Sequence, residues 1–125
     1  MGFVAKLLMF PFYGRQKRLA SKRPSLSEEE FVRRCSETSE DQPAASYVFR
    51  HLLEHTLHTA FTPYPDDCLE KVFGIAEEEL DEDLILALLR DQQVPPPTDE
   101  DVRKFGPVRT PADVVAFVRF ARDVS

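Results

Sequence analysis

The pattern that most constrains this chain is a series of apolar residues at helical spacing, divided into segments by prolines. Spacings of three and four place apolar side chains on one face of a helix. No segment shows a convincing alternation of apolar and polar residues, which would indicate a strand. Proline cannot continue the hydrogen-bond ladder of a helix, so Pro63, Pro65 and the run 95–97 are expected to end helices. The sequence therefore predicts an all-α fold.

Two long helices are expected to supply most of the core. The first covers about 44–61, and its buried face is formed by Phe49, Leu52, Leu53, Thr56 and Ala60. The second covers about 77–91, with a core stripe formed by Leu80, Leu84, Ala87 and Leu88 and widened by Ile85 and Leu89. Between them, residues 66–75 are expected to form a loop pinned by Leu69, Val72 and Phe73.

Polar capping residues mark the starts of three shorter helices. Ser27, with Glu30 three residues later, has the pattern of a capping box and predicts a short helix before a loop at 36–43. Thr98 is expected to cap a single helical turn, and Thr110 to cap the last helix. The buried face of that last helix is predicted to be Val114, Phe117, Val118 and Ala121.

Charge is distributed unevenly along the chain. Residues 1–24 hold no acid and six basic residues: Lys6, Arg15, Lys17, Arg18, Lys22 and Arg23. The whole chain carries −6, so residues 25–125 carry −12. We therefore divide the chain into a basic and apolar arm (1–24), a short helix and loop (25–43) and an acidic helical bundle (44–125). Nucleic acid is not an expected partner, because the acidic body would repel phosphates.

Three short motifs follow one another in the carboxyl-terminal half of the chain. The first runs from Gly74 through Glu-Glu-Glu-Leu-Asp at 77–81, and the second is Val-Pro-Pro-Pro-Thr-Asp-Glu-Asp at 94–101. The third is Thr-Pro-Ala-Asp-Val-Val-Ala-Phe-Val at 110–118. Their order resembles an acyl carrier protein over about residues 44–122. The resemblance implies a four-helix bundle, here with an amino-terminal helical extension.

The serine of the carrier family's attachment motif, Gly-x-Asp-Ser-Leu, is missing from this chain. Matching Leu80-Asp81 to the family's motif places Glu79 at the serine position, and keeping Gly74 in register places Glu77 there. Neither alignment supplies the hydroxyl that holds the phosphopantetheine group. We therefore expect no cofactor, and a carrier-like module that has lost cargo attachment and acts through protein–protein contact.

The helix at 77–91 is the partner-recognition helix that the resemblance implies. Six carboxylates crowd its first two turns: Glu77, Glu78, Glu79, Asp81, Glu82 and Asp83. They repel one another, so a partner protein with a basic patch would relieve the repulsion and be steered by it in a salt-dependent way. The alternative is a solvated acidic face that favours the start of the helix and keeps the protein soluble.

Nothing in the sequence indicates an enzyme. The two cysteines, Cys35 and Cys68, have no paired spacing and no neighbouring base, and they favour a reduced, cytoplasmic chain. The three histidines, His51, His55 and His58, are spaced by four and three. On one helix they would share an exposed face opposite the core, which makes them weak candidates for a metal site. A metal-binding helical protein is therefore the third functional reading.

The arm is the other functional candidate. A short helix is expected over about 2–10, with breaks at Pro11 and Gly14. Its apolar residues need burial, and we expect them to pack on protein, either on the chain's own bundle or on a second copy in a homodimer. The alternative is a peripheral membrane protein whose arm binds an anionic bilayer. The apolar residues concerned are Phe3, Leu7, Leu8, Phe10 and Phe12.

Overall fold

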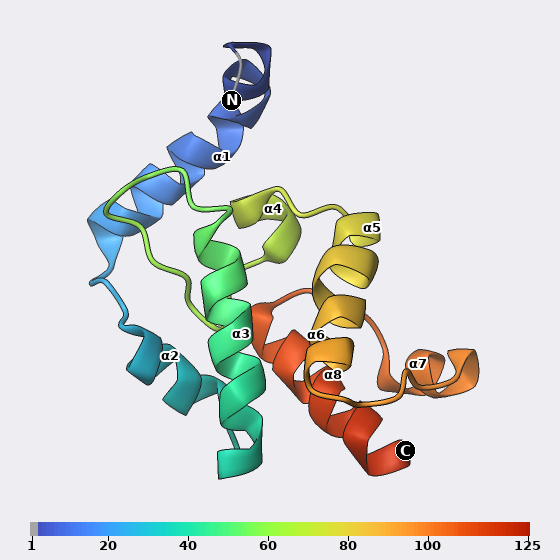
Figure 1. Cartoon of the computed structure of the whole chain (residues 1–125). Helices are drawn as coiled ribbons and strands as arrows, with labels where there is room; N and C mark the ends of the chain where they lie inside the picture. Colours follow the sequence, from blue (N-terminus) through green and yellow to red (C-terminus); the bar gives the residue numbers. More distant parts are fainter. Residues whose placement is uncertain (1–2) are drawn as a thin grey trace.

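The computed structural model describes the backbone of residues 3–125 and the side chains of residues 11–125. Within that part of the chain every regular element is helical, which confirms the predicted all-α class (Figure 1). In chain order the elements are α1 (Phe3–Lys22), α2 (Glu28–Cys35), the 3₁₀ turn η1 (Ser39–Asp41), α3 (Gln42–Leu53), α4 (Leu69–Phe73), α5 (Glu77–Glu79), the π-helix η2 (Leu80–Leu86), α6 (Ala87–Asp91), α7 (Asp99–Phe105) and α8 (Pro111–Val124).

The core lies where α3 meets α2, α8 and α6. Each of these helices turns its apolar stripe toward the others. The stripes predicted for the helix at 77–91, which corresponds to α5, η2 and α6, and for α8 are buried apart from the half-buried Ala87. Aromatic rings fill the space between elements, with Phe31 against Phe49 and Phe61 against Phe73. Residues with no exposed surface include Phe31, Val48, Leu52, Phe73, Leu84, Leu88, Val114 and Val115.

The helix starts are where the capping residues predict them. Ser27 accepts a hydrogen bond from the Glu30 backbone N–H at 3.1 Å, and Thr98 accepts one from the Asp101 N–H at 3.2 Å. Thr110 forms a complete capping box with the third residue of α8. The box predicted at Ser27 is only half formed, because the Glu30 carboxylate pairs with Arg33 and Arg34 instead of returning to the cap.

Helix α3 ends much earlier than predicted. It stops at Leu53, and residues 54–61 form turns and irregular backbone. Leu53 and Ala60, both predicted to be buried, are exposed. The physical reason lies on a different element: Gln16 of α1 accepts hydrogen bonds from the backbone N–H groups of Leu57 and His58, at 2.8 and 3.3 Å. Those N–H groups would otherwise continue the α3 ladder.

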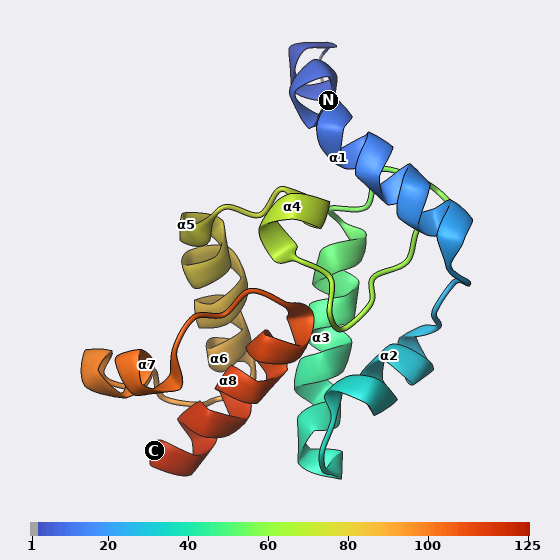
Figure 2. The same ribbon diagram turned by 180° about the vertical axis from the view of Figure 1, so that it is seen from behind.

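Helix α1 is longer than predicted, because it continues through Pro11 and Gly14 to Lys22. A proline inside a helix removes one hydrogen bond, and this cost is offset here by contacts of the turns that follow. Gln16 is fully buried, and its amide nitrogen donates to the carbonyls of His55 (3.2 Å) and Val72 (3.0 Å). The carboxyl-terminal half of α1 therefore docks on the body, while both views show its first turns projecting away from the other helices (Figures 1 and 2).

A second anchor holds the end of the arm. The Arg23 guanidinium makes two hydrogen bonds of 2.7 Å to the buried carboxylate of Asp67. The same guanidinium lies over the rings of Tyr64, at 3.9 Å from the centroid, and of Phe61, at 5.1 Å. A paired, hydrogen-bonded arginine stacked on aromatic rings is held far more firmly than a solvent-exposed ion pair.

The segment predicted as a loop at 66–75 contains the one-turn helix α4. Its pinning residues Leu69, Val72 and Phe73 are buried, as predicted. The turn ends at Gly74, whose φ of 69° is in the left-handed region that favours glycine. The Phe12 ring lies directly over this glycine, so that a Cβ there would be 3.0 Å from it. The glycine is thus required both by its backbone angle and by the docking of α1.

Candidate functional site

The acidic surface is the exposed start of the helix formed by α5, η2 and α6. Its six carboxylates all lie on exposed residues: Glu77, Glu78, Glu79, Asp81, Glu82 and Asp83. In the described part of the chain none of them forms an ion pair, whereas other acids, such as Glu28 and Asp67, pair with arginines of the same chain. This surface therefore presents concentrated negative charge to solvent.

Along this helix the acidic residues are exposed and most of the leucines are buried. The seven residues Leu80–Leu86 form a π-helix, a widened turn that is rare and is often found at functional sites. Leu80, Leu84 and Ile85 are buried, and Asp81 is exposed between them. The wide core face predicted from Ile85 and Leu89 is confirmed, since both residues are buried.

The two positions that could replace the carrier serine are both exposed glutamates, Glu77 and Glu79. The serine nearest in sequence, Ser46, is on α3 and donates its hydroxyl to Glu28 at 2.9 Å. The start of this helix therefore offers exposed carboxylates and no hydroxyl. Carboxylates at the start of a helix are stabilised by the positive end of the helix dipole, and they are complementary to a basic patch on a partner protein.

The three histidines do not share a helix face, so that part of the metal hypothesis is wrong. Because α3 ends at Leu53, only His51 lies on it. The His51 and His55 rings are 5.1 Å apart, whereas the His58 ring packs against Tyr13 at 5.5 Å. All three are half-buried, not exposed as predicted. Among the side chains of residues 11–125, no group of three or more metal-ligating residues is close enough to hold an ion.

His51 links the end of α3 to the acidic surface electrostatically. Burial lowers the pKa of His51, and the neighbouring His55 adds to that effect. The carboxylates of Glu54, Asp83 and Glu79 act in the opposite direction and do not outweigh burial.

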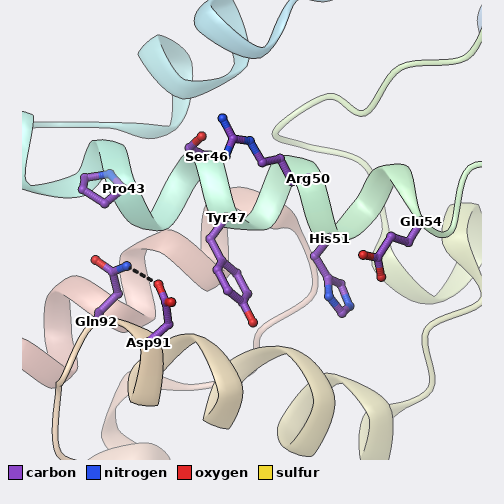
Figure 3. Close-up of a pocket in the computed structure, with 8 residues that line it drawn as sticks. All are labelled: Pro43, Ser46, Tyr47, Arg50, His51, Glu54, Asp91 and Gln92. Carbon is purple, nitrogen blue, oxygen red and sulfur yellow. Dashed lines mark hydrogen bonds between the residues drawn. The ribbon is translucent and has the colours of Figure 1, made fainter.

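A polar groove of about 530 Å³ runs between α3 and the end of α6 (Figure 3). Tyr47 and His51 face it from α3, Glu54 borders it just beyond the end of that helix, and Asp91 and Gln92 face it from the other wall. Arg50 also borders the groove, but its guanidinium bonds to Glu28 at 3.1 Å. Sequence reasoning missed this groove, because it depends on the distance between two helices and not on the pattern of either.

A smaller and more apolar groove of about 330 Å³ lies beside the acidic surface. It is bordered by Leu86, which is 39% exposed, and by Gln93, whose φ of 57° is unusual for a residue other than glycine. The proline run contributes its other wall. The complete lining is Leu86, Leu89, Arg90, Gln93, Val94, Pro95 and Pro96.

The cysteines offer no reactive thiolate at these grooves. Burial raises the pKa of Cys35 to about 12, so its thiol stays protonated at physiological pH. Cys68 is half-buried at the cap of α4, on a different element from either groove.

The arm's basic residues fall into two groups. Arg15 and Arg23 contact the body, where Arg15 donates to the Lys71 carbonyl at 2.7 Å. Lys17, Arg18 and Lys22 are exposed, and none of them forms an ion pair with residues 11–125. The side chains of Phe3, Lys6, Leu7, Leu8 and Phe10 lie outside the described residues.

Comparisons with protein-family models, with curated proteins and with solved structures find no match for this chain. Along the described residues 3–125, no helix has both the length and the apolar character needed to cross a membrane. The resemblance to acyl carrier proteins stays a prediction that depends on the three motifs.

Proposed function

We propose that this protein is a non-catalytic interaction module, carrier-like in the order of its helices, which binds a basic partner protein through the acidic surface at 77–83 and carries no cargo. The observation that carries the proposal is six exposed carboxylates, without internal ion pairs among the described residues, at the start of one helix. An acidic face that only keeps a protein soluble does not need its carboxylates to be gathered at one end of a helix. A recognition surface for a basic patch benefits from this arrangement.

The order of elements supports the carrier-like part of the proposal. A core helix, α3, precedes the acidic helix, and a proline run then leads into the short helix α7 and the final helix α8. Carrier proteins are expected to have this sequence of helices, with their attachment site at the start of the acidic one. In this chain the same place holds glutamates, so the recognition surface is present without the attachment site.

Electrostatics predicts how such binding behaves. Neighbouring carboxylates on the first two turns raise one another's free energy when no cation is near, and a basic partner removes that cost. Exposed charges are screened within about 8 Å at physiological ionic strength, so binding is expected to weaken steeply as salt is added. Association is expected to be fast, because opposite fields steer the partners together.

The test is to titrate the isotope-labelled protein with a synthetic lysine-rich helical peptide and to monitor the amide chemical shifts of the protein by NMR. We expect shifts centred on 77–86 that disappear in high salt. The variant E77Q/E78Q/E79Q should bind roughly 10-fold more weakly, since each exposed ion pair contributes about 0.5 kcal/mol.

The matched control is D99N/E100Q/D101N, which removes the same charge from the first turn of α7. This control should bind nearly as well as the unaltered chain. Equal weakening by both variants would mean that the peptide responds to net charge alone, and the proposed surface would then be abandoned.

A further inference from the structure

The composition of α1 changes along its length and not around its circumference. Residues 3–13 contain a single charged residue, Lys6, among aliphatic and aromatic residues. The following stretch, 14–23, contains five basic residues and no acid. A helix that lies flat on a membrane has one apolar side and one polar side. This helix instead has an apolar end that projects from the body, the tip (3–11), and three exposed basic residues nearer to the body, the collar (Lys17, Arg18 and Lys22).

The structure holds the collar in place and directs the tip outward. Gln16 and Arg23 fix the carboxyl-terminal half of α1 to the body, and Phe12 packs over Gly74. The collar residues are exposed between these anchors. The ribbon of the first turns runs away from every other helix in both views (Figures 1 and 2). The chain therefore has a helix end of apolar composition that projects from the body, with three exposed basic residues on one side of the same helix near the body.

We propose that α1 anchors the protein to an anionic lipid bilayer, with the tip inserted end-on into one leaflet and the collar bound to the headgroups. Nine helical residues, 3–11, extend about 14 Å, which is close to half of a hydrocarbon core about 30 Å thick. Lys6 can reach back along the helix toward the headgroup layer, as long basic side chains do. The collar supplies the attraction to anionic lipids that a short apolar segment needs for stable binding.

A lipid surface fits the tip better than a second copy of the chain does. A second copy would need an apolar groove large enough for several aromatic side chains, each of which buries about 150–250 Å². The mainly apolar groove beside the acidic surface has a volume of about 330 Å³, and exposed apolar residues such as Leu53, Val102 and Val124 lie on three different helices. A bilayer accommodates the whole tip without a preformed groove.

The anchor and the acidic surface are separate features of the molecule. In both views α4 lies between α1 and α5, so the two charged regions have different positions on the fold (Figures 1 and 2). The membrane proposal therefore does not depend on the proposed protein partner. E77Q/E78Q/E79Q should bind vesicles at least as well as the unaltered chain, because it removes only repulsion from anionic lipid.

The experiment is co-sedimentation of the full chain with vesicles of phosphatidylcholine containing phosphatidylserine, and with vesicles of phosphatidylcholine alone. We expect binding that needs phosphatidylserine and decreases with salt. K17Q/R18Q/K22Q should lower the partition coefficient of the protein between water and anionic vesicles by roughly 100-fold, because each basic residue near an anionic surface contributes to binding. L7E/L8E should abolish binding, because it places two charges in the apolar tip.

The control R103Q/K104Q/R109Q removes the same charge from exposed positions outside the arm and should retain most of the binding. Melting and gel filtration of every variant separate loss of binding from loss of folding, and the proposal requires unchanged melting for the tip and collar variants. Equal binding to both kinds of vesicle, or an equal loss in the control, would overturn the anchor. A dimer that L7E/L8E dissociates, without vesicle binding, would identify a second copy as the occupant instead.

Discussion

Gln16→Ala is expected to be among the most destabilising single substitutions outside the apolar core. The Gln16 side chain is fully buried, and its amide makes four hydrogen bonds to backbone groups of two other segments: His55 C=O, Val72 C=O, Leu57 N–H and His58 N–H. Each intramolecular hydrogen bond contributes about 1 kcal/mol net, and a buried group left without a partner costs about 1–3 kcal/mol. Water that enters the vacated space would restore some of these bonds, so we expect a loss of about 3 kcal/mol in the free energy of unfolding.

The assay is urea unfolding followed by circular dichroism, with hydrogen exchange to localise the effect. Gln16→Met keeps most of the volume and removes only the hydrogen bonds, so it separates their contribution from that of packing. Gln42→Ala, at an exposed position on α3, is the matched control and should change stability by less than about 0.5 kcal/mol. A loss below about 0.5 kcal/mol for Gln16→Ala, with unchanged exchange at the Leu57 amide, would refute the docking of α1 described above.

Two further predictions concern the core and the pH dependence of folding. Leu84→Ala and Phe117→Ala should each lower the free energy of unfolding in urea by about 2–5 kcal/mol. His55→Ala should lower it by less than about 1 kcal/mol, because His55 is only half-buried. Similar losses for all three variants would mean that His55 is part of the core. Burial acts to raise the pKa of Asp41, but hydrogen bonds from Arg119 and from two backbone N–H groups outweigh it and lower that pKa. The native carboxylate therefore contributes stability that is complete above the ordinary aspartate pKa of about 3.9 and is lost as pH falls below it. Asp41→Asn should lower stability at neutral pH and flatten the loss in acid, and an unchanged acid profile of thermal melting would contradict this account.

Local signals in the sequence were sufficient for the helix starts and for most of the core. Ser27, Thr98 and Thr110 cap the helices that they were predicted to cap, because an N-cap depends only on residues within one turn. The stripe of Leu80, Leu84 and Leu88 is buried even though Leu80–Leu86 is a π-helix, since these side chains belong to the same core cluster as residues of α3 and α8.

The errors arose where residues distant in the sequence decide the local structure. The end of α3 depends on Gln16, which is about forty residues away. This contact leaves no periodic pattern in the sequence. The groove between α3 and α6 was missed for the same reason, because it exists only once two helices are placed side by side. The acidic surface could be predicted, because exposure of six nearly consecutive acids follows from the cost of burying charge.

The proposal that this protein is carrier-like but carries no cargo can be tested most directly by attempting to attach the carrier prosthetic group. The purified protein is incubated with coenzyme A and a broad-specificity phosphopantetheinyl transferase, and its intact mass is measured beside that of a bona fide acyl carrier protein in the same reaction. The carrier should gain the mass of the prosthetic group, and this chain should remain unchanged, because Glu77 and Glu79 occupy the candidate serine positions. A mass gain of phosphopantetheine on this chain, localised to any residue by fragmentation, would contradict the account.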